Sequence, residues 1–322
     1  MKAIVYTKFG PPDRLQLKEV DKPTPKDNEI LIKVRAASAN AYDWRHLRAD
    51  PFLIRLMGAG LLRPKHRILG ADVAGQVEAV GGQVKQFRPG DEVFGEGSYG
   101  GFAEYVCVDE SRFVLKPANL TFEEAAAIPM AALTALQGLR DKGQIQAGQK
   151  VLINGASGGV GTFAVQIAKA FEAEVTGVCS TAKMDLVRSI GADHVIDYTQ
   201  EDVTKGGRQY DLIFDVAAYH KISDYKRILS SNGNFVVAGG PMARMLHLML
   251  LSMTGAKNMK LMVAKIDQKD LLFIIELINL GKVKPIIDRR YPLNETAEAL
   301  RYLEEGHARG KVVITVESPQ GD

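Results

Sequence analysis

A cluster of glycines at residues 155–161 carries the clearest chemistry in the chain. It follows an apolar run and reads Gly-Ala-Ser-Gly-Gly-Val-Gly, so that Ala156, Gly158 and Gly161 give the spacing A-x-G-x-x-G. A strand that ends in a tight glycine turn and restarts as a helix leaves unpaired N–H groups and the positive end of a helix dipole facing outward. A pyrophosphate can bind there without meeting a Cβ atom. The predicted phosphate-binding residues are Gly155, Ala156, Ser157, Gly158, Gly159, Val160 and Gly161.

The elements that must position this turn alternate between strands and helices. Apolar residues after the glycines recur with the period of one helical face. Strand-like runs and helical patterns then follow one another, which implies right-handed crossovers and a parallel sheet. The predicted strands are 150–153, 174–179, 194–197, 211–216 and 234–238, and the predicted helices are 182–190 and 221–229. The expected fold class is α/β with a doubly wound, Rossmann-type parallel sheet, and a glycine-rich turn in another α/β sheet is the alternative.

The choice of dinucleotide can be argued from the residues after the second predicted strand. NAD-binding units place a carboxylate there to accept hydrogen bonds from the ribose hydroxyls. This chain instead offers Ser180, Thr181 and Lys183, which are groups that a 2′-phosphate needs. Tyr198, which follows the third strand, can add a hydroxyl or pack along the adenosine. The sequence therefore predicts NADPH rather than NADH, although Ser180 and Thr181 are also good residues for a helix N-cap.

Length and composition set further limits. A chain of 322 residues fits two domains, and its 46% hydrophobic and 25% charged residues are ordinary for a globular protein. The net charge of +3 comes without a basic stripe, so we expect no nucleic-acid partner. Two cysteines, Cys107 and Cys179, predict a reducing compartment, with the cytoplasm as the default. The longest apolar stretch, 242–253, is interrupted by charge and too short for a membrane span, which needs about 20 residues.

The two ends of the chain differ from its middle. Short strand-like runs separated by Pro, Gly and Asp clusters give the first part an all-β pattern. Near the C-terminus we expect strand 260–265, helix 268–280, helix 294–305 with Asn294 as its cap, and strand 311–316. The predicted division is 1–120 for a β-rich domain, 121–258 for the dinucleotide-binding domain, and 259–322 for a return to the first domain.

The whole chain resembles the medium-chain dehydrogenase/reductase superfamily, and within it the zinc-free quinone oxidoreductases and their enone-reducing relatives. The resemblance implies a GroES-like β domain, a Rossmann domain, a cofactor cleft between them and a homodimer. It rests on several sequence blocks, among them Asn28–Val34, Ser38–Trp44, Leu69–Gly75, Phe87–Val93, Ala126–Leu136, the glycine motif, Gly191–Val195 and Gly310–Val313.

The resemblance also bears on metal binding. A catalytic zinc site needs about three N, S or O ligands and one open position. At the positions that carry these ligands in zinc-dependent relatives, this chain has Asn40, Ala71 with Asp72, and Met130. Neither Asn40 nor Ala71 supplies a ligand suited to zinc, and the thioether of Met130 is a poor one. The four-cysteine structural zinc lobe is also missing, because the chain has only two cysteines. We therefore expect no metal.

The same blocks supply candidate site residues. We expect catalytic roles for Asn40, Tyr42 and Thr134, through hydrogen bonds to the nicotinamide, its ribose or the developing oxyanion. Each also has a plain structural interpretation: a satisfied turn residue, a packed core tyrosine and a back-bonded helix hydroxyl. Residues expected to line the nicotinamide half of the cleft are Ala217 and Gly239. Lys311 is a candidate to reach the phosphates, but a solvated lysine at the start of a strand is the preferred interpretation.

Without a metal, hydride transfer to an acceptor that spreads its own charge remains feasible. Quinones and α,β-unsaturated carbonyl compounds are such acceptors, so the sequence predicts an NADPH-dependent reductase of these small molecules. The alternatives are a zinc-independent alcohol or aldehyde oxidoreductase, and an NADPH-binding structural or redox-sensing protein that has lost catalysis. Four methionines at helical spacing, Met242, Met245, Met249 and Met253, form either an adaptable substrate lid or an ordinary core or dimer helix.

Overall fold

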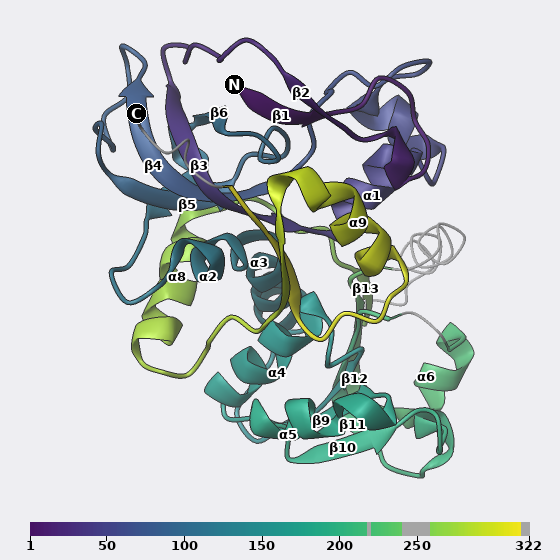
Figure 1. Cartoon of the computed structure of the whole chain (residues 1–322). Coiled ribbons are helices and arrows are strands. Elements are labelled where there is room, and N and C mark those ends of the chain that lie inside the picture. The colour runs from purple at the N-terminus through teal and green to yellow at the C-terminus, as the bar shows by residue number, and fades with distance from the viewer. Residues whose placement is uncertain (218–219, 240–257, 317–322) are drawn as a thin grey trace. The chain divides into compact units, whose positions relative to one another are not determined.

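The computed structural model describes residues 1–217, 220–239 and 258–316. They form two compact units (Figure 1). Unit 1 comprises 1–130, 266–272 and the chain from 285 onward, and unit 2 comprises 131–265 and 273–284. The Met-rich segment 242–253 lies outside the described residues.

Unit 2 is built on a six-stranded sheet with the order β10-β9-β8-β11-β12-β13, in which every pairing is parallel. This confirms the predicted α/β class and its doubly wound sheet. The strands are β8 (Lys150–Asn154), β9 (Glu174–Cys179), β10 (His194–Asp197), β11 (Tyr210–Asp215), β12 (Leu229–Val237) and β13 (Met259–Leu261).

Helices pack on this sheet through alternating apolar residues. Leu152, Ile213 and Phe235 of the sheet share a core with Tyr225 of α6. Glycine-rich α4 is buried along most of its length and contacts β8 and β9. The helices wholly within unit 2 are α4 (Gly159–Ala170), α5 (Met184–Ser189) and α6 (Ile222–Ile228), with shorter turns at Gly138–Lys142, Thr181–Lys183 and Val203–Lys205. Two further helices, α3 (Pro129–Gln137) and α8 (Gln268–Asn279), begin in unit 1 and end in unit 2.

Some predicted boundaries in unit 2 were wrong. The helix expected at 182–190 divides into the turn Thr181–Lys183 and α5, because Lys183 leaves the helical conformation at φ −117° and ψ 0°. The strand expected at 260–265 is only three residues long, and β12 begins five residues earlier than expected, at Leu229. Gly191 follows the end of α5 at φ +105°, a conformation that favours glycine.

Unit 1 is a β structure with a mixed seven-stranded sheet. Its order is β14-β15-β3-β4-β5-β7, and β6 pairs with the long strand β3. A separate antiparallel pair, β1 and β2, lies at the N-terminus. The strands are β1 (Lys2–Val5), β2 (Gln16–Glu19), β3 (Glu29–Ala39), β4 (Asp72–Val80), β5 (Glu92–Glu96), β6 (Tyr105–Asp109), β7 (Phe113–Leu115), β14 (Ile287–Pro292) and β15 (Lys311–Thr315).

Unit 1 also contains two helices that the all-β pattern did not predict, α1 (Ala41–Arg48) and α2 (Phe122–Ala126). The helix expected at 294–305 is present as α9 (Thr296–Glu304). Short turns lie at Pro12–Arg14, Arg55–Ala59, Glu110–Arg112 and Leu293–Glu295. Asp43 starts α1, since its Oδ2 accepts the Asn40 N–H at 2.8 Å. The expected cap Asn294 was wrong: it lies inside the turn Leu293–Glu295, and Glu295 occupies the N-cap of α9.

Candidate active site

The glycine turn of unit 2 has the backbone geometry that the spacing predicts. It joins the end of β8 to the start of α4. Gly155 has φ +86°, and a Cβ there would lie 3.1 Å from the Cβ of Ala217. Gly161 lies so close to the turn that a Cβ would sit 2.0 Å from the Gly155 carbonyl oxygen. Both positions therefore need glycine, one for its conformation and one for close packing.

Gly158, unlike Gly155 and Gly161, has room for a Cβ atom. It occupies the N-cap of α4 with an ordinary φ of −84°, and no side chain caps the helix. The nearest atom to a Cβ at Gly158 would be the Gly155 carbonyl oxygen at 3.6 Å. The first N–H groups of α4 are thus left without a side-chain partner and can bind a ligand. A side chain at Gly158 would occupy the space where that ligand binds. This arrangement fits a dinucleotide pyrophosphate.

Buried hydrogen bonds hold the strand ends below this turn. The Asn154 side-chain amide donates to Asp215 Oδ1 and to the Tyr225 hydroxyl, both at 2.8 Å. Asn154 is the last residue of β8 and Asp215 the last of β11, which are neighbouring parallel strands. The pair therefore fixes the sheet edge from which the glycine turn starts. Sequence reasoning did not single out either residue.

The predicted 2′-phosphate residues gather at the end of β9, together with an unexpected carboxylate. Ser180 is an N-cap residue whose side chain makes no capping hydrogen bond. The Thr181 hydroxyl donates to Asp197 Oδ2, and the Thr199 N–H donates to Asp197 Oδ1 at 2.9 Å. The hydrogen bond from Thr181 is the main cause of the lowered pKa of Asp197. Lys183 is half-buried beside this group, and Tyr198 is 52% exposed.

Asp197 was missed because it lies at the end of β10 rather than β9. The parallel register places it opposite Cys179, the last residue of β9. The sequence signal was an aspartate that ends a predicted strand, but only strand pairing brings it next to Thr181.

The remaining predicted residues of unit 2 follow the same edge of the sheet. Ala217 comes shortly after β11 and Gly239 shortly after β12, both beyond the carboxyl ends of parallel strands. Thr134 lies in the middle of α3. Asn40, Tyr42 and Lys311 belong to unit 1.

A buried polar network lies in unit 1 around Asn40. Its side-chain amide donates to Asp72 Oδ2 at 3.0 Å and to the Ser38 carbonyl at 3.2 Å, while its Oδ1 accepts from the Lys311 ammonium. Lys311 is 3% exposed and also lies 3.5 Å from Asp72 Oδ2. Lys311, expected to line the cofactor or to be solvated, is instead a buried partner of Asn40. The amide of Asn40 is held in one orientation by three partners.

Asp43 ties two loops to this network. Its carboxylate accepts from the N–H groups of Asn40 at 2.8 Å and Gly70 at 3.0 Å. Complete burial raises its pKa to about 7, although these two hydrogen bonds oppose the shift.

Tyr42 belongs to an aromatic group next to Asp43. Its ring centroid lies 3.8 Å from that of His46 and 5.8 Å from that of Tyr99, and its hydroxyl hydrogen-bonds with Tyr99. Burial raises the pKa of Tyr42 strongly, helped by Tyr99, Asp43 and Glu96. His46 Nδ1 lies 2.8 Å from the Tyr42 carbonyl oxygen, so that nitrogen carries the proton. Burial lowers the pKa of His46, which favours the neutral ring.

The donor set around Asn40 does not fit a zinc ion. Its amide oxygen already accepts from Lys311, whose ammonium would repel a cation. Ala71 offers no ligand atom, and the Met130 N–H donates to Asp72 Oδ1 at 3.0 Å. Within the part of the chain that the structure describes, no group of three or more His, Cys, Asp or Glu side chains is arranged to hold a metal ion.

Both cysteines are free thiols. Cys107 is half-buried in β6 and Cys179 is buried at the end of β9. Burial raises the pKa of each thiol to about 11. Among the helices within the described ranges, none combines the length and apolar character needed to cross a membrane.

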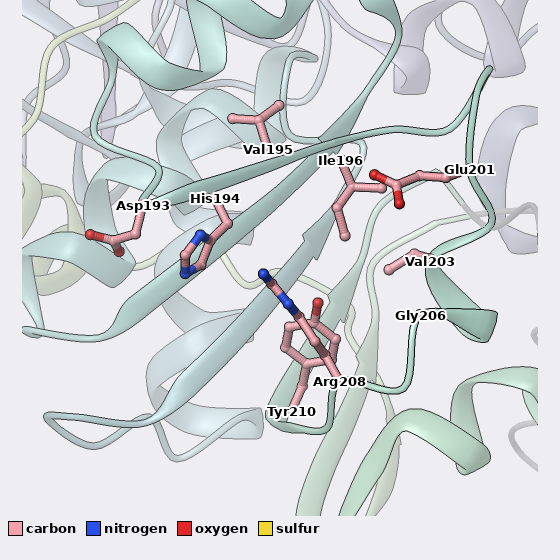
Figure 2. Close-up of a pocket in the computed structure, with 9 residues that line it drawn as sticks. All are labelled: Asp193, His194, Val195, Ile196, Glu201, Val203, Gly206, Arg208 and Tyr210. Carbon is pink, nitrogen blue, oxygen red and sulfur yellow. The ribbon is translucent and has the colours of Figure 1, made fainter.

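A polar cavity of about 320 Å³ lies elsewhere on unit 2. Figure 2 shows Arg208 reaching into it between His194 and Tyr210. His194 and Tyr210 are the first residues of β10 and β11, whereas the glycine turn follows the last residue of β8. Because the strands are parallel, the cavity wall at these residues and the glycine turn belong to opposite ends of the sheet. The cavity therefore lies apart from the turn where the sequence predicts the pyrophosphate.

Comparisons with known families agree with this architecture. Residues 26–118 match the alcohol dehydrogenase GroES-like domain. Residues 190–314 match a family described as zinc-binding dehydrogenase. The first match lies within unit 1, and the second covers parts of both units.

Individual relatives cover nearly the whole chain. It is 34% identical to the chloroplast envelope quinone oxidoreductase homolog of Arabidopsis thaliana, over 98% of each chain. It is also 34% identical to the NADPH-dependent alkenal/one oxidoreductase of the same plant, over 98% of this chain and 79% of that one. A quinone oxidoreductase from Coxiella burnetii has a similar structure, with a TM-score of 0.88, 29% identity and coverage of 98% and 99%.

A doubly wound unit with a dinucleotide turn, together with a GroES-like β unit, defines an oxidoreductase that uses a nicotinamide cofactor. The chain belongs to the medium-chain dehydrogenase/reductase superfamily, in its quinone oxidoreductase-like branch, which confirms the predicted family.

Proposed function

We propose that this protein transfers a hydride from NADPH to quinones or α,β-unsaturated carbonyl compounds without a metal ion. The observation that carries the proposal is the Lys311–Asn40–Asp72 network, in which a buried ammonium engages the ligand atoms that a cation would need. Without a Lewis acid, an acceptor must spread its own negative charge. Quinones and enones do so as phenolates and enolates. The relatives named as a quinone oxidoreductase homolog and an alkenal/one oxidoreductase support the same acceptor classes.

The residues of the chain have distinct roles in this proposal. The turn from Gly155 to Gly161 holds the pyrophosphate, and residues after the strand ends, including Ala217 and Gly239, line the rest of the cofactor. Bound there, the reduced nicotinamide supplies the hydride. Tyr42 donates a hydrogen bond to the developing oxyanion, as a phenol whose raised pKa keeps it protonated. Asn40, oriented by Lys311, and Thr134 position the nicotinamide and its ribose.

Consumption of NADPH against a panel of quinones, enones and simple aldehydes tests the proposal. We expect turnover with quinones and enones, and negligible NADP-linked oxidation of simple alcohols. Unchanged turnover after exhaustive chelation is expected as well. If NADPH raises the thermal stability and yet no acceptor consumes it, the protein is a binding or sensing factor and the proposal fails.

We propose NADPH rather than NADH because Ser180, Lys183 and Tyr198 lie together after β9 and β10. Asp197 sits in the same group, but its charge is already engaged by Thr181 and Thr199. These hydrogen bonds keep Asp197 ionised, so Lys183 must offset its repulsion of a 2′-phosphate.

We also propose a homodimer that works in the cytoplasm. The family resemblance supports the dimer, and two free thiols are typical of a reducing compartment. Sedimentation equilibrium of the purified protein tests the dimer, and a single species at the monomer mass would contradict it.

A further inference from the structure

The chain between α1 and β4 exposes a concentration of apolar side chains (Figure 1). Eleven large apolar side chains are exposed among the described residues, and five of them lie within residues 52–62. They are Phe52 at 60%, Leu53 at 40%, Leu56 at 63%, Leu61 at 54% and Leu62 at 87% exposure. Side chains this exposed add little to the stability of the fold, because hydrophobic stabilisation comes from burial. Single exposed leucines are ordinary, whereas a concentration of them marks a surface that contacts something else.

Backbone hydrogen bonds, rather than the exposed side chains, hold this segment in shape. The Lys65 N–H donates to the Ala59 carbonyl oxygen at 2.8 Å, which closes the segment into a loop. The Tyr6 N–H donates to the Arg67 carbonyl oxygen at 3.0 Å and ties the end of the loop to the N-terminal part of unit 1. Ala59 and Pro64 are buried beneath the exposed leucines' backbone. The exposure of the apolar side chains is therefore a property of the folded loop.

Arg55 joins the two halves of the loop. Its guanidinium carbon lies 5.3 Å from the centroid of the Phe52 ring and 4.7 Å from that of Phe9. One of its terminal nitrogens lies 3.5 Å from the Leu61 carbonyl oxygen. Because one side chain contacts both halves, Phe52 and Leu61 belong to a single surface.

Positive charge accompanies these apolar side chains. Residues 51–71 contain four Arg and Lys residues and no Asp or Glu. Arg63, Lys65 and Arg67 are exposed, and none of the three forms an ion pair with a residue in the described ranges. Arg48, at the end of α1, differs because it is paired with Glu304. We call residues 52–62 together with the three unpaired cations the apolar–basic surface.

The charge of this surface decides which partner fits it. In a two-fold contact between copies of the chain, the same cations would face each other and repel. An anionic lipid bilayer instead offers acyl chains to the apolar side chains and phosphate groups to the cations. Each Lys or Arg held near an anionic membrane strengthens binding about fivefold.

We propose that the apolar–basic surface docks the protein on the anionic surface of a lipid bilayer. The apolar side chains enter the boundary between headgroups and acyl chains, and the cations face the lipid phosphates. The whole surface belongs to unit 1. Docking of this kind requires neither cofactor nor turnover, so it stands apart from the proposed function. It would nevertheless bring the protein to apolar acceptors, which dissolve in lipid.

Co-sedimentation with lipid vesicles tests this docking. Vesicles of phosphatidylcholine alone are compared with vesicles that also contain phosphatidylserine. We expect the wild type to bind the anionic vesicles about tenfold more tightly, or better, than the neutral ones. Raising the salt from about 0.1 M to about 1 M should release most of the protein, because the screening length falls from about 10 Å to about 3 Å.

Two double variants separate the apolar contribution from the charged one. Leu61→Ser with Leu62→Ser removes two exposed apolar side chains and should weaken binding to anionic vesicles about tenfold or more. Arg63→Gln with Lys65→Gln should weaken it about 25-fold, at about fivefold for each cation. Because all four side chains are exposed, denaturant unfolding should be unchanged, which distinguishes lost docking from lost folding.

Matched control variants change the same residue types at exposed positions elsewhere in the chain. Leu115→Ser with Leu280→Ser is the control for the leucines, and Lys18→Gln with Lys226→Gln is the control for the cations. Both controls should bind anionic vesicles as the wild type does.

Three results would overturn the proposal. The first is equal binding of the wild type to anionic and neutral vesicles, or binding to neither. The second is unchanged vesicle binding by either double variant. The third is self-association in solution that Leu61→Ser with Leu62→Ser abolishes while no vesicle is bound, which would make the surface an interface between copies of the chain.

Discussion

In unit 2 the groups offered to a ligand are backbone N–H groups, held in place by glycines that admit no side chain. In unit 1 the functional groups are buried side chains that hold one another through hydrogen bonds. The glycine turn is therefore sensitive to the volume of one methyl group, since a Cβ at Gly161 would sit 2.0 Å from a carbonyl oxygen. The network is sensitive to charge, because Asp72, Lys311 and Asn40 satisfy each other. The two units thus depend on different physical constraints, steric in unit 2 and electrostatic in unit 1.

Removal of a charge from unit 1 should have the largest effect. Lys311→Met leaves Asp72 buried without its counter-charge, and we expect a loss of about 3–5 kcal/mol in the free energy of unfolding. Denaturant unfolding measures this loss. The double change Lys311→Met with Asp72→Asn should recover part of it, and Lys18→Met, on the exposed strand β2, should be near neutral. A loss below about 1 kcal/mol for the single variant would mean that the ammonium is solvated.

Stability should also fall as the pH rises. Between the ordinary pKa of 4.5 and about 8, the folded chain keeps a proton on Glu96 that the unfolded chain has released. The folded state therefore binds more protons in this window, so its free energy of unfolding decreases with increasing pH. We expect a decrease of a few kcal/mol, part of it due to the raised pKa of Asp43. E96Q should flatten the profile, and an equally steep profile in the variant would remove Glu96 from this account.

Alanine substitutions in the glycine turn of unit 2 should distinguish an effect on protein stability from an effect on NADPH binding. Gly161→Ala forces the Gly155 carbonyl to move, and we expect about 3 kcal/mol of destabilisation together with loss of NADPH binding. Gly158→Ala has room in the free protein and an ordinary φ, so it should fold normally and yet bind NADPH more weakly. Thermal unfolding with and without NADPH distinguishes the two. Tight NADPH binding by Gly158→Ala would place the pyrophosphate elsewhere.

The smallest expected effect concerns one contact to the cofactor. Lys183→Ala should weaken the stabilisation by NADPH by about 1–3 kcal/mol, which is the value of one charge-assisted hydrogen bond to phosphate. Stabilisation by NADH should not change. Titration calorimetry of both nucleotides against both proteins measures the difference. Equal affinities of the wild type for NADPH and NADH would reverse the cofactor assignment.

The sequence predicted the parts of the molecule whose rules are local. Strands β9 and β10 begin and end where expected, because a β-branched run between turn residues defines each of them. The glycine turn could also be predicted, because the positions of its glycines are set by steric contacts among residues that are close in sequence. The helix expected to be capped by Asn294 starts later, because residues 293–295 form a tight turn of their own.

The unit 1 network could not be predicted in the same way. Ser38, Asp72 and Glu96 become neighbours only through the register of three strands, and Lys311 arrives from the far end of the chain. Asp197 likewise meets Thr181 only because β10 pairs with β9. Burial then raises the pKa of carboxyl groups such as Asp43 and Glu96, and this shift cannot be predicted from a sequence pattern.

The raised pKa values of the two cysteines have a consequence for a protein proposed to handle electrophiles. Quinones and enones alkylate thiolates, so an enzyme that binds them risks inactivating itself. With a pKa of about 11, each thiol is ionised in about one molecule in ten thousand at neutral pH. Intact-mass spectrometry after prolonged incubation with a quinone should accordingly find Cys107 and Cys179 unmodified. The raised thiol pKa values thus protect the protein from the electrophiles proposed as its substrates.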